Sequence, residues 1–219
     1  MKKKSSKLIQ IACDGGAATG KSTGAKMIAK KYNLKFLSSG LLYRYAAYLI
    51  LKHKPKNKIK FLFNKFKNLK YEKLEENNLH TNKISEYSAE IAKINKIRKI
   101  LKNYQNSFSK KNRACCIEGR DIATKILPNS DIKFFFICKL NLAASRRFKE
   151  LKKINSKIKL KDVKKSLKIR NILDTKRKNS PLLKHRDSIE IDTGKLNKKA
   201  MLAKMSKYVE KIIKTKYGN

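Results

Sequence analysis

The chain has 219 residues, of which 41% are apolar, so it can bury the core of one sizeable domain. Its formal net charge of +41 would by itself favour nucleic acid as a partner. The lysines are spread over the whole chain without a clustered basic tail, and no apolar run is long enough to span a membrane. We therefore expect neither specific nucleic-acid binding nor a membrane span.

Short apolar strands alternate with helices along the chain. Strands are expected at residues 8–13, 34–37, 113–117, 131–138 and 188–191. Helices are expected at residues 21–32, 41–51, 83–94, 96–109, 141–153, 160–177 and 196–214. The lysine-rich section 52–80 has no clear pattern. Because the strands are continuous apolar runs, the pattern predicts an α/β fold with a parallel five-stranded sheet covered on both faces.

One domain over residues 1–219 accounts for this order of elements. Its core would comprise residues 1–50, 111–144 and 179–219, with a small insertion at about 51–110 and a mobile lid at about 145–178. The apolar stretch 8–13 is too short for the hydrophobic region of a secretion signal, so we expect a cytoplasmic protein.

The cysteines show no metal-ligand spacing and lie inside apolar runs. They are Cys13, Cys115, Cys116 and Cys138. Cys115 and Cys116 are adjacent and would point to opposite faces of a strand. We expect all four to be small core residues of a reducing compartment.

Residues 15–22 read Gly-Gly-Ala-Ala-Thr-Gly-Lys-Ser and fit the phosphate-binding pattern G-x-x-x-x-G-K-[ST]. A strand is predicted before the motif and a helix after it, as a P-loop requires. Lys21 would reach the β- and γ-phosphates, and the Ser22 hydroxyl would ligate Mg²⁺. The sequence therefore predicts that ATP binds at Gly15, Gly16, Ala17, Ala18, Thr19, Gly20, Lys21, Ser22 and Thr23.

The arginines are informative because lysine stands almost everywhere else. Of 57 Lys and Arg residues only nine are arginines, a bias that resembles drift towards AT-rich codons. An arginine kept against this drift is a candidate for a planar, bidentate grip on a phosphate. Since GTPase signatures are absent, the arginines at strand ends and in late helices favour phosphoryl transfer to a small acceptor.

Several segments, in order along nearly the whole chain, resemble bacterial cytidylate kinases. Residues 37–44 read Leu-Ser-Ser-Gly-Leu-Leu-Tyr-Arg, and residues 117–121 read Ile-Glu-Gly-Arg-Asp. The other matching segments are 11–23, 127–134, 145–151, 174–182 and 189–193; only 52–80 is hard to match. The resemblance implies a P-loop nucleoside monophosphate kinase of pyrimidine metabolism. It would act as a monomer and use ATP and Mg²⁺ to phosphorylate CMP and dCMP.

The resemblance also implies roles for individual residues. Binding of CMP would involve Ser39, Arg44, Arg98, Arg120, Asp121, Arg170, Asp174 and Arg177. Of these, the cytosine would be held by Ser39, Arg98, Asp121 and Arg177, and the acceptor phosphate by Arg44 and Arg120. Arg170 and Asp174 would lie near the sugar and the transferring phosphoryl group. Catalysis would rest on Lys21, Arg120, Arg147 (in the lid) and Arg170, and the insertion would bind CMP.

Some positions depart from the family pattern or fall outside it. Ser38 stands where an aspartate is usual, and Ala89 where a sugar-side serine is usual, which leaves the preference between ribose and deoxyribose open. Arg113 and Arg186 match no family role, and we expect them on the solvated surface.

Two alternatives remain at the level of the sequence. One is another P-loop kinase with a different small acceptor, and the other is a basic nucleic-acid-binding protein that holds ATP only as a ligand. Turnover with a panel of acceptors would test the first, and the salt dependence of duplex binding would test the second.

Overall fold

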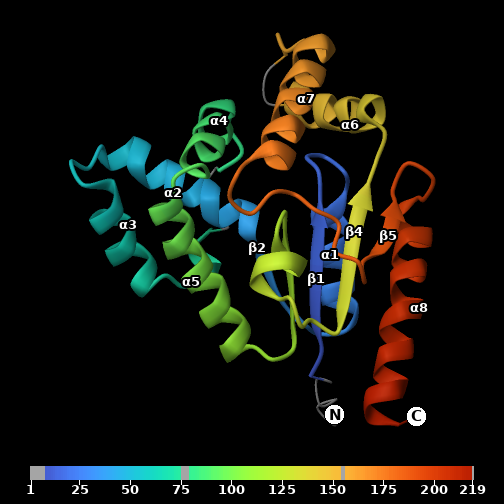
Figure 1. Ribbon diagram of the computed structural model, residues 1–219. Coiled ribbons are helices and arrows are strands. Elements are labelled where there is room, and N and C mark those ends of the chain that lie inside the picture. The colour runs from blue at the N-terminus through green and yellow to red at the C-terminus, as the bar shows by residue number, and fades with distance from the viewer. Residues whose placement is uncertain (1–7, 75–78, 154–155, 219) are drawn as a thin grey trace. The chain divides into compact units, whose positions relative to one another are not determined.

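The structure is a computed structural model that describes residues 8–74, 79–153 and 156–218 (Figure 1). The chain divides into two compact units, one of Met1–Phe36 with Arg113–Asn219 and one of Leu37–Asn112. The expected insertion at 51–110 falls inside the second unit, which begins earlier in the chain. The basic segment 1–7 and residues 75–78 of the lysine-rich section lie outside the described residues.

A five-stranded sheet organises the first unit, with the strand order β2-β3-β1-β4-β5. The strands are β1 (Gln10–Gly15), β2 (Lys35–Ser38), β3 (Cys115–Gly119), β4 (Ile132–Ile137) and β5 (Ile189–Asp192). The central strand β1 pairs in parallel with β3 and β4, and β4 pairs in parallel with β5. The predicted parallel sheet is confirmed, and the phosphate-binding motif follows its middle strand.

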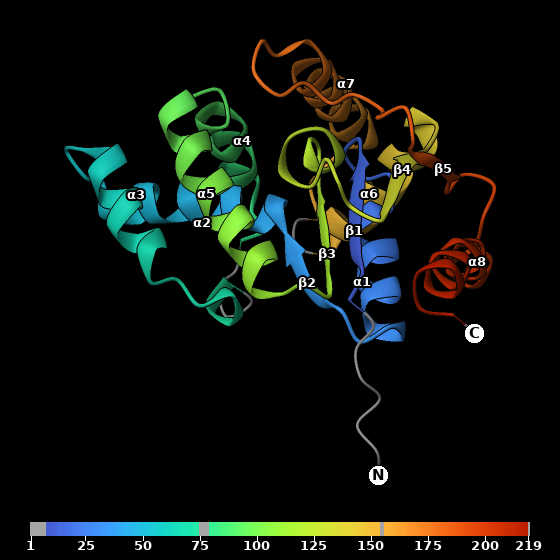
Figure 2. The ribbon, with the colours of Figure 1, turned by 60° about the horizontal axis from the view of Figure 1, so that its bottom comes forward.

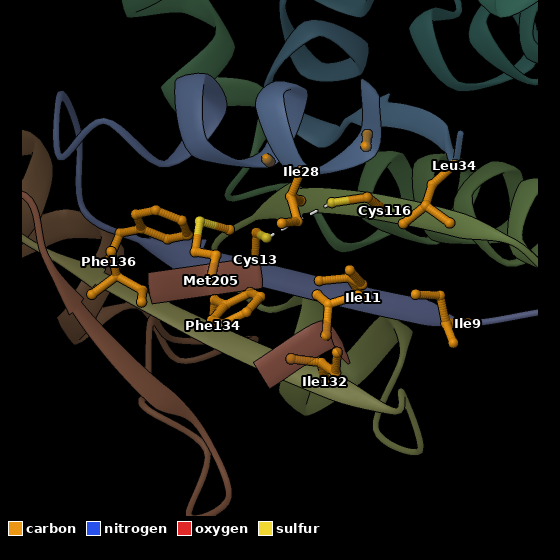
Figure 3. Close-up of a cluster of buried hydrophobic side chains, with 14 of the residues drawn as sticks. Ile9, Ile11, Cys13, Ile28, Leu34, Cys116, Ile132, Phe134, Phe136 and Met205 are labelled. Atoms are coloured by element: carbon orange, nitrogen blue, oxygen red, sulfur yellow. Dashed lines mark hydrogen bonds between the residues drawn. The ribbon is translucent and has the colours of Figure 1, made fainter. Parts of the chain in front are cut away.

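One face of the sheet is covered by α1 (Lys21–Lys31) and α8 (Lys198–Tyr217). Figure 2 shows both helices on the same side of the sheet. Figure 3 shows the apolar cluster between the sheet and these helices, in which Cys13 and Phe134 of the sheet contact Ile28 of α1 and Met205 of α8. Because the strands lie beneath helices, their residues are apolar without alternation, which is the pattern read from the sequence.

On the other face lies η2 (Ile122–Ile126), a single turn of π-helix directly after β3. It was not predicted. The helices α6 (Leu140–Lys152) and α7 (Leu160–Lys176) pack against each other and against Ala17 of the phosphate-binding loop (Figure 1). The first unit therefore carries helical segments on both sides of its sheet and two helices beside the loop.

Three of the four cysteines bear out the prediction of small core residues. Cys13 and Cys116 lie together in the core with their sulfur atoms 3.8 Å apart, and Cys115 is buried outside that cluster, as the alternation of a strand requires. Cys138 is only half-buried and packs against the smaller apolar cluster beside the loop, so it lies at the edge of the core rather than inside it. All four are free thiols.

The second unit is helical, with α2 (Ser39–His53), α3 (Lys58–Lys67), η1 (Tyr71–Leu74), α4 (Asn82–Ile91) and α5 (Asn95–Lys111). Both α3 and η1 lie in the lysine-rich section that showed no clear pattern. A signal for α3 was present, because Asn57 caps it by accepting the Lys60 N–H at 3.0 Å. Leu62 and Phe66, four residues apart, form its buried side. None of the helices in the described ranges is long and apolar enough to cross a membrane.

Candidate active site

The phosphate-binding motif forms the turn between β1 and α1. A side chain at Gly15 would place its Cβ only 2.5 Å from the backbone oxygen of Phe136, so only glycine fits there. Gly20 is the N-cap of α1 and has a φ of 81°, in the left-handed region that glycine adopts most easily. The loop therefore leads directly into the amino end of α1. At a helix amino end, N–H groups without a partner in the helix and the helix dipole favour binding of an anion.

Lys21 is the first residue of α1, and its side chain is buried. Its amino nitrogen lies 3.6 Å from a carboxylate oxygen of Glu118, the residue before the last of β3. Burial, reinforced by the charge of Arg120, lowers the pKa of Lys21 to about 8 although Glu118 opposes the shift. Ser22, the next residue, is exposed and can offer its hydroxyl to a ligand.

Positive charge gathers around this lysine. Burial and then the charge of Arg120 lower the pKa of Arg170 in α7 to about 10, and Arg147 of α6 adds to the shift. The structure thus brings the four proposed catalytic residues, Lys21, Arg120, Arg147 and Arg170, into one electrostatic cluster. Buried cations that depress one another's pKa are costly to the fold and are typical of a site for a polyanion.

Asp174, at the end of α7, joins two arginines of this region. Its carboxylate lies 2.8 Å from Nε of Arg120 and 3.5 Å from Nη1 of Arg177. Arg177 in turn lies 3.9 Å from the carboxylate of Asp121. Although burial acts to raise the pKa of Asp174, the charge and hydrogen bond of Arg120 hold it below its usual range. The expected CMP-binding residues of the first unit are therefore neighbours.

Arg146 and Arg147 are adjacent in α6 but have different contacts. Arg147 pairs with Glu150 at 2.9 Å on the helix surface. Arg146 donates to the backbone oxygen of Thr193 at 2.8 Å and to its hydroxyl at 3.0 Å. That hydroxyl donates to the backbone oxygen of Thr19 at 2.8 Å, so Arg146 supports the phosphate-binding loop through Thr193, the residue after β5. No role was assigned to Arg146 from the sequence, although its survival among lysines was a signal.

Asn171 of α7 also reaches the loop. Its side-chain oxygen accepts the N–H of Ala17 at 3.1 Å, and the same oxygen would lie 3.2 Å from a Cβ at Gly16. The Asn171 side-chain oxygen therefore accepts a backbone N–H of the kind that P-loops donate to phosphate oxygens. Asn171 was not among the predicted site residues, because its partner is more than 150 positions away in the sequence.

The second unit holds the other three residues expected to bind CMP. Ser39 is buried and begins α2. Arg44 donates to the backbone oxygen of Leu79 at 3.0 Å and to the hydroxyl of Ser85 at 2.6 Å. Arg98 is buried, and its guanidinium carbon lies 5.7 Å from the centre of the Tyr43 ring. All three belong to one compact unit.

The departures from the family pattern also have a structural setting in the second unit. Ser38 caps α2 by accepting the Leu41 N–H at 3.3 Å, which is a role that an aspartate serves equally well. Ser88, beside Ala89 in α4, is buried and donates its hydroxyl to the backbone oxygen of Ser85 at 2.7 Å. Ser38 therefore serves as the cap of α2.

The two arginines without an expected role lie on the surface. Arg113 is exposed, and the side chain of Arg186 is 91% exposed beside Asp187. The prediction of a solvated surface position is confirmed for both. They provide natural controls for the arginines of the candidate site.

Known proteins resemble this chain over most of its length. The family model described as cytidylate kinase matches residues 11–211. The chain is 32% identical to the cytidylate kinase of Flavobacterium johnsoniae, across 95% of this chain and 99% of that protein. It is 34% identical to the cytidylate kinase of Mesomycoplasma hyopneumoniae strain 232, across 93% of this chain and 94% of that protein.

Among solved structures, an uncharacterized protein from Eubacterium ventriosum shares the fold. The TM-score is 0.54 with 18% sequence identity, over 94% of this chain and 99% of that chain. The resemblance read from the sequence motifs is confirmed by the family model and the curated relatives. The chain belongs to the cytidylate kinase family of nucleoside monophosphate kinases.

Proposed function

We propose that this protein transfers the γ-phosphoryl group of ATP to CMP, and to dCMP, giving ADP and CDP or dCDP. The observation that carries the proposal is the cationic cluster of Lys21, Arg120 and Arg170 beside the phosphate-binding loop. Several phosphates bound at the same time would neutralise the charge of such a cluster. Membership of the cytidylate kinase family indicates that the acceptor is CMP.

The transfer needs positioning and charge neutralisation more than proton transfer. The nucleophile is an oxygen of the acceptor phosphate, which already carries negative charge. Lys21 would bind the β- and γ-phosphates, Arg120 the acceptor phosphate, and Arg170 the charge on the transferring group. Arg120 is now paired with Asp174 at 2.8 Å, so the acceptor phosphate would compete with that carboxylate.

A magnesium ion fits the donor set beside the loop. The exposed Ser22 hydroxyl and the Glu118 carboxylate, which lies 3.6 Å from the Lys21 nitrogen, are the protein oxygens that would hold it. Within the described ranges no group of three or more His, Cys, Asp or Glu could hold a metal. Few protein ligands suit Mg²⁺, which takes most of its oxygens from phosphates and water. Such an ion would neutralise charge on the triphosphate.

Recognition of the base would fall to the polar residues that family membership implies. The side chains of Asp121, Arg177, Ser39 and Arg98 would supply an acceptor and donors for the edge of cytosine. The second unit would act as the CMP-binding region, and residues 145–178 as a lid that excludes water. That the enzyme is monomeric and cytoplasmic remains a prediction from the sequence.

A steady-state assay tests the proposal. Release of ADP from ATP is measured in the presence of Mg²⁺ with CMP, dCMP, UMP, AMP or shikimate, and without an acceptor. We expect kcat/KM to be highest for CMP or dCMP. Preference for AMP or shikimate, or equal ADP release without an acceptor, would overturn it.

A further inference from the structure

Asp14 is a buried carboxylate to which neither the sequence motifs nor the proposed function assigns a role. It is the residue before Gly15 in β1, and it is 1% exposed. Its two carboxylate oxygens accept backbone N–H groups of Ile122 at 2.9 Å and Ala123 at 2.7 Å. Asp14 thus connects the strand that enters the phosphate-binding loop with the turn that follows β3.

The two donors are the first N–H groups of η2, which begins at Ile122. Groups at the start of a helical turn lack partners within the turn, and the preceding N-cap side chain commonly satisfies them. Here the N-cap residue is Asp121, whose side chain makes no capping hydrogen bond. Asp14 supplies the cap from 108 and 109 positions away in the sequence.

This exchange of roles leaves the carboxylate of Asp121 available to face Arg177, 3.9 Å away. It also fixes the backbone directly after Arg120, whose guanidinium is expected to hold the acceptor phosphate. A buried carboxylate is costly for a task that a neutral cap could perform. Burial raises the pKa of Asp14 to about 7, even though the two N–H groups act to lower it.

We propose that Asp14 is a positioning residue for acceptor recognition, which caps η2 in place of Asp121 and so aims Arg120 and Asp121 at CMP. The inference rests on the proposed function, because it assigns Arg120 and Asp121 to the acceptor. It predicts that loss of the cap weakens use of CMP more than use of ATP.

The experiment compares Asp14→Asn and Asp14→Ala with a matched control, Asp131→Asn. Asp131 also accepts a backbone N–H of β1, that of Gln10 at 2.7 Å, but at the opposite end of the strand. For each full-length variant, kcat, the KM for CMP, the KM for ATP and the midpoint of denaturant unfolding are measured.

Loss of both capping bonds in Asp14→Ala should raise the KM for CMP by about tenfold or more, and Asp14→Asn, which keeps one acceptor oxygen, should raise it less. The KM for ATP should change by less than about threefold in both. Asp131→Asn should lower the unfolding midpoint and leave both KM values within about twofold of the parent. Should Asp14→Ala fail to fold, Asp14→Asn keeps the comparison.

A double variant shows whether Asp14 acts through Arg120. If it does, Asp14→Asn should raise the KM for CMP of an Arg120→Lys protein by a smaller factor than that of the parent, because the aim of the guanidinium is already lost and only that of Asp121 remains. Equal increases in both KM values, full additivity with Arg120→Lys, or a loss of stability alone would overturn the proposal. Failure of the parent protein to phosphorylate CMP would instead overturn the proposed function.

Discussion

The two compact units of this chain specify their structure in different ways. In the first unit, close backbone approaches and polar contacts between distant segments decide which residue can stand at a position, as at Gly15 and at Arg146. In the second unit, helices such as α3 need only an apolar side and a cap, here Leu62, Phe66 and Asn57. Lysine can occupy the rest of such a helix at little cost.

The contrast explains why the phosphate-binding loop of the first unit is clear in the sequence, whereas the lysine-rich section 52–80 of the second unit shows no clear pattern. A phosphate-binding loop depends on its glycines, lysine and hydroxyl at fixed places, so compositional drift cannot change them without loss of the site. A surface helix keeps its structure through many exchanges between polar residues. Functional residues of the second unit should therefore be few, and the predictions below test whether they are Arg44 and Arg98.

The largest effect is expected from Lys21→Ala. Removal of the charge on the β- and γ-phosphates should lower kcat by at least about 100-fold, or about 3 kcal/mol of transition-state stabilisation. The protein should remain folded, with a lower unfolding midpoint, because the buried Glu118 carboxylate loses its partner at 3.6 Å. Turnover and denaturant unfolding measure the two quantities, and turnover within a few-fold of the parent would refute the role given to the loop.

Exchange of arginine for lysine separates shape from charge in both units. At Arg44 in the second unit, and at Arg120, Arg170 and Arg177 in the first, the loss of the planar fork should cost at least about tenfold in turnover or CMP affinity, about 1.4 kcal/mol. At the exposed Arg113 and Arg186 the same exchange should change neither. Equal effects in the two groups would mean that the survival of arginines carries no functional information.

Asp121→Ala tests base recognition in the first unit. A polar group that pairs with cytosine discriminates because a wrong base leaves it unpaired. The ratio of kcat/KM for CMP to that for UMP should fall by several-fold, on the order of 1 kcal/mol. A parallel fall on both acceptors would place Asp121 among the structural residues, and Arg98→Ala makes the corresponding measurement in the second unit.

The pH dependence of the unfolding free energy should reveal the raised pKa of Asp14. Its pKa lies at about 7 in the folded protein against an ordinary value of 3.8. Between these values the folded state holds a proton that the unfolded chain has released, so this group makes the unfolding free energy fall as pH rises. From about pH 5 to about pH 8 the parent should lose more than about 1 kcal/mol relative to Asp14→Asn. Parallel pH curves for the two proteins would contradict the raised pKa.

The smallest effect is expected at Ala18, which has a φ of 57° in the left-handed region. Relief of this strain by Ala18→Gly gains about 1 kcal/mol, and the greater freedom of glycine in the unfolded chain offsets most of it. Stability should change by less than about 1 kcal/mol, whereas Gly20→Ala, at a φ of 81°, should cost about 1–2 kcal/mol. Denaturant titrations of both variants compare them.

Local sequence patterns account for most of the strands and helices that were predicted correctly. The five strands and most helices were found because buried strands and amphipathic helices have their own periods, and the loop because its residues are contiguous. The turn η2 was missed because its first N–H groups are capped by Asp14 rather than by a neighbour in the chain. The helix α3 was missed because its cap and apolar side stand among many lysines.

The sequence alone determined the fold class, the phosphate-binding loop and the family, because these depend on contiguous motifs and on their order. Only the tertiary structure decided that Arg146 supports the loop through Thr193, that Asn171 contacts Ala17, and that Asp14 caps η2. Each of these three contacts joins a side chain to a backbone group far away in the chain. A backbone N–H or C=O looks the same whatever the residue, so such a pairing leaves no mark in the sequence.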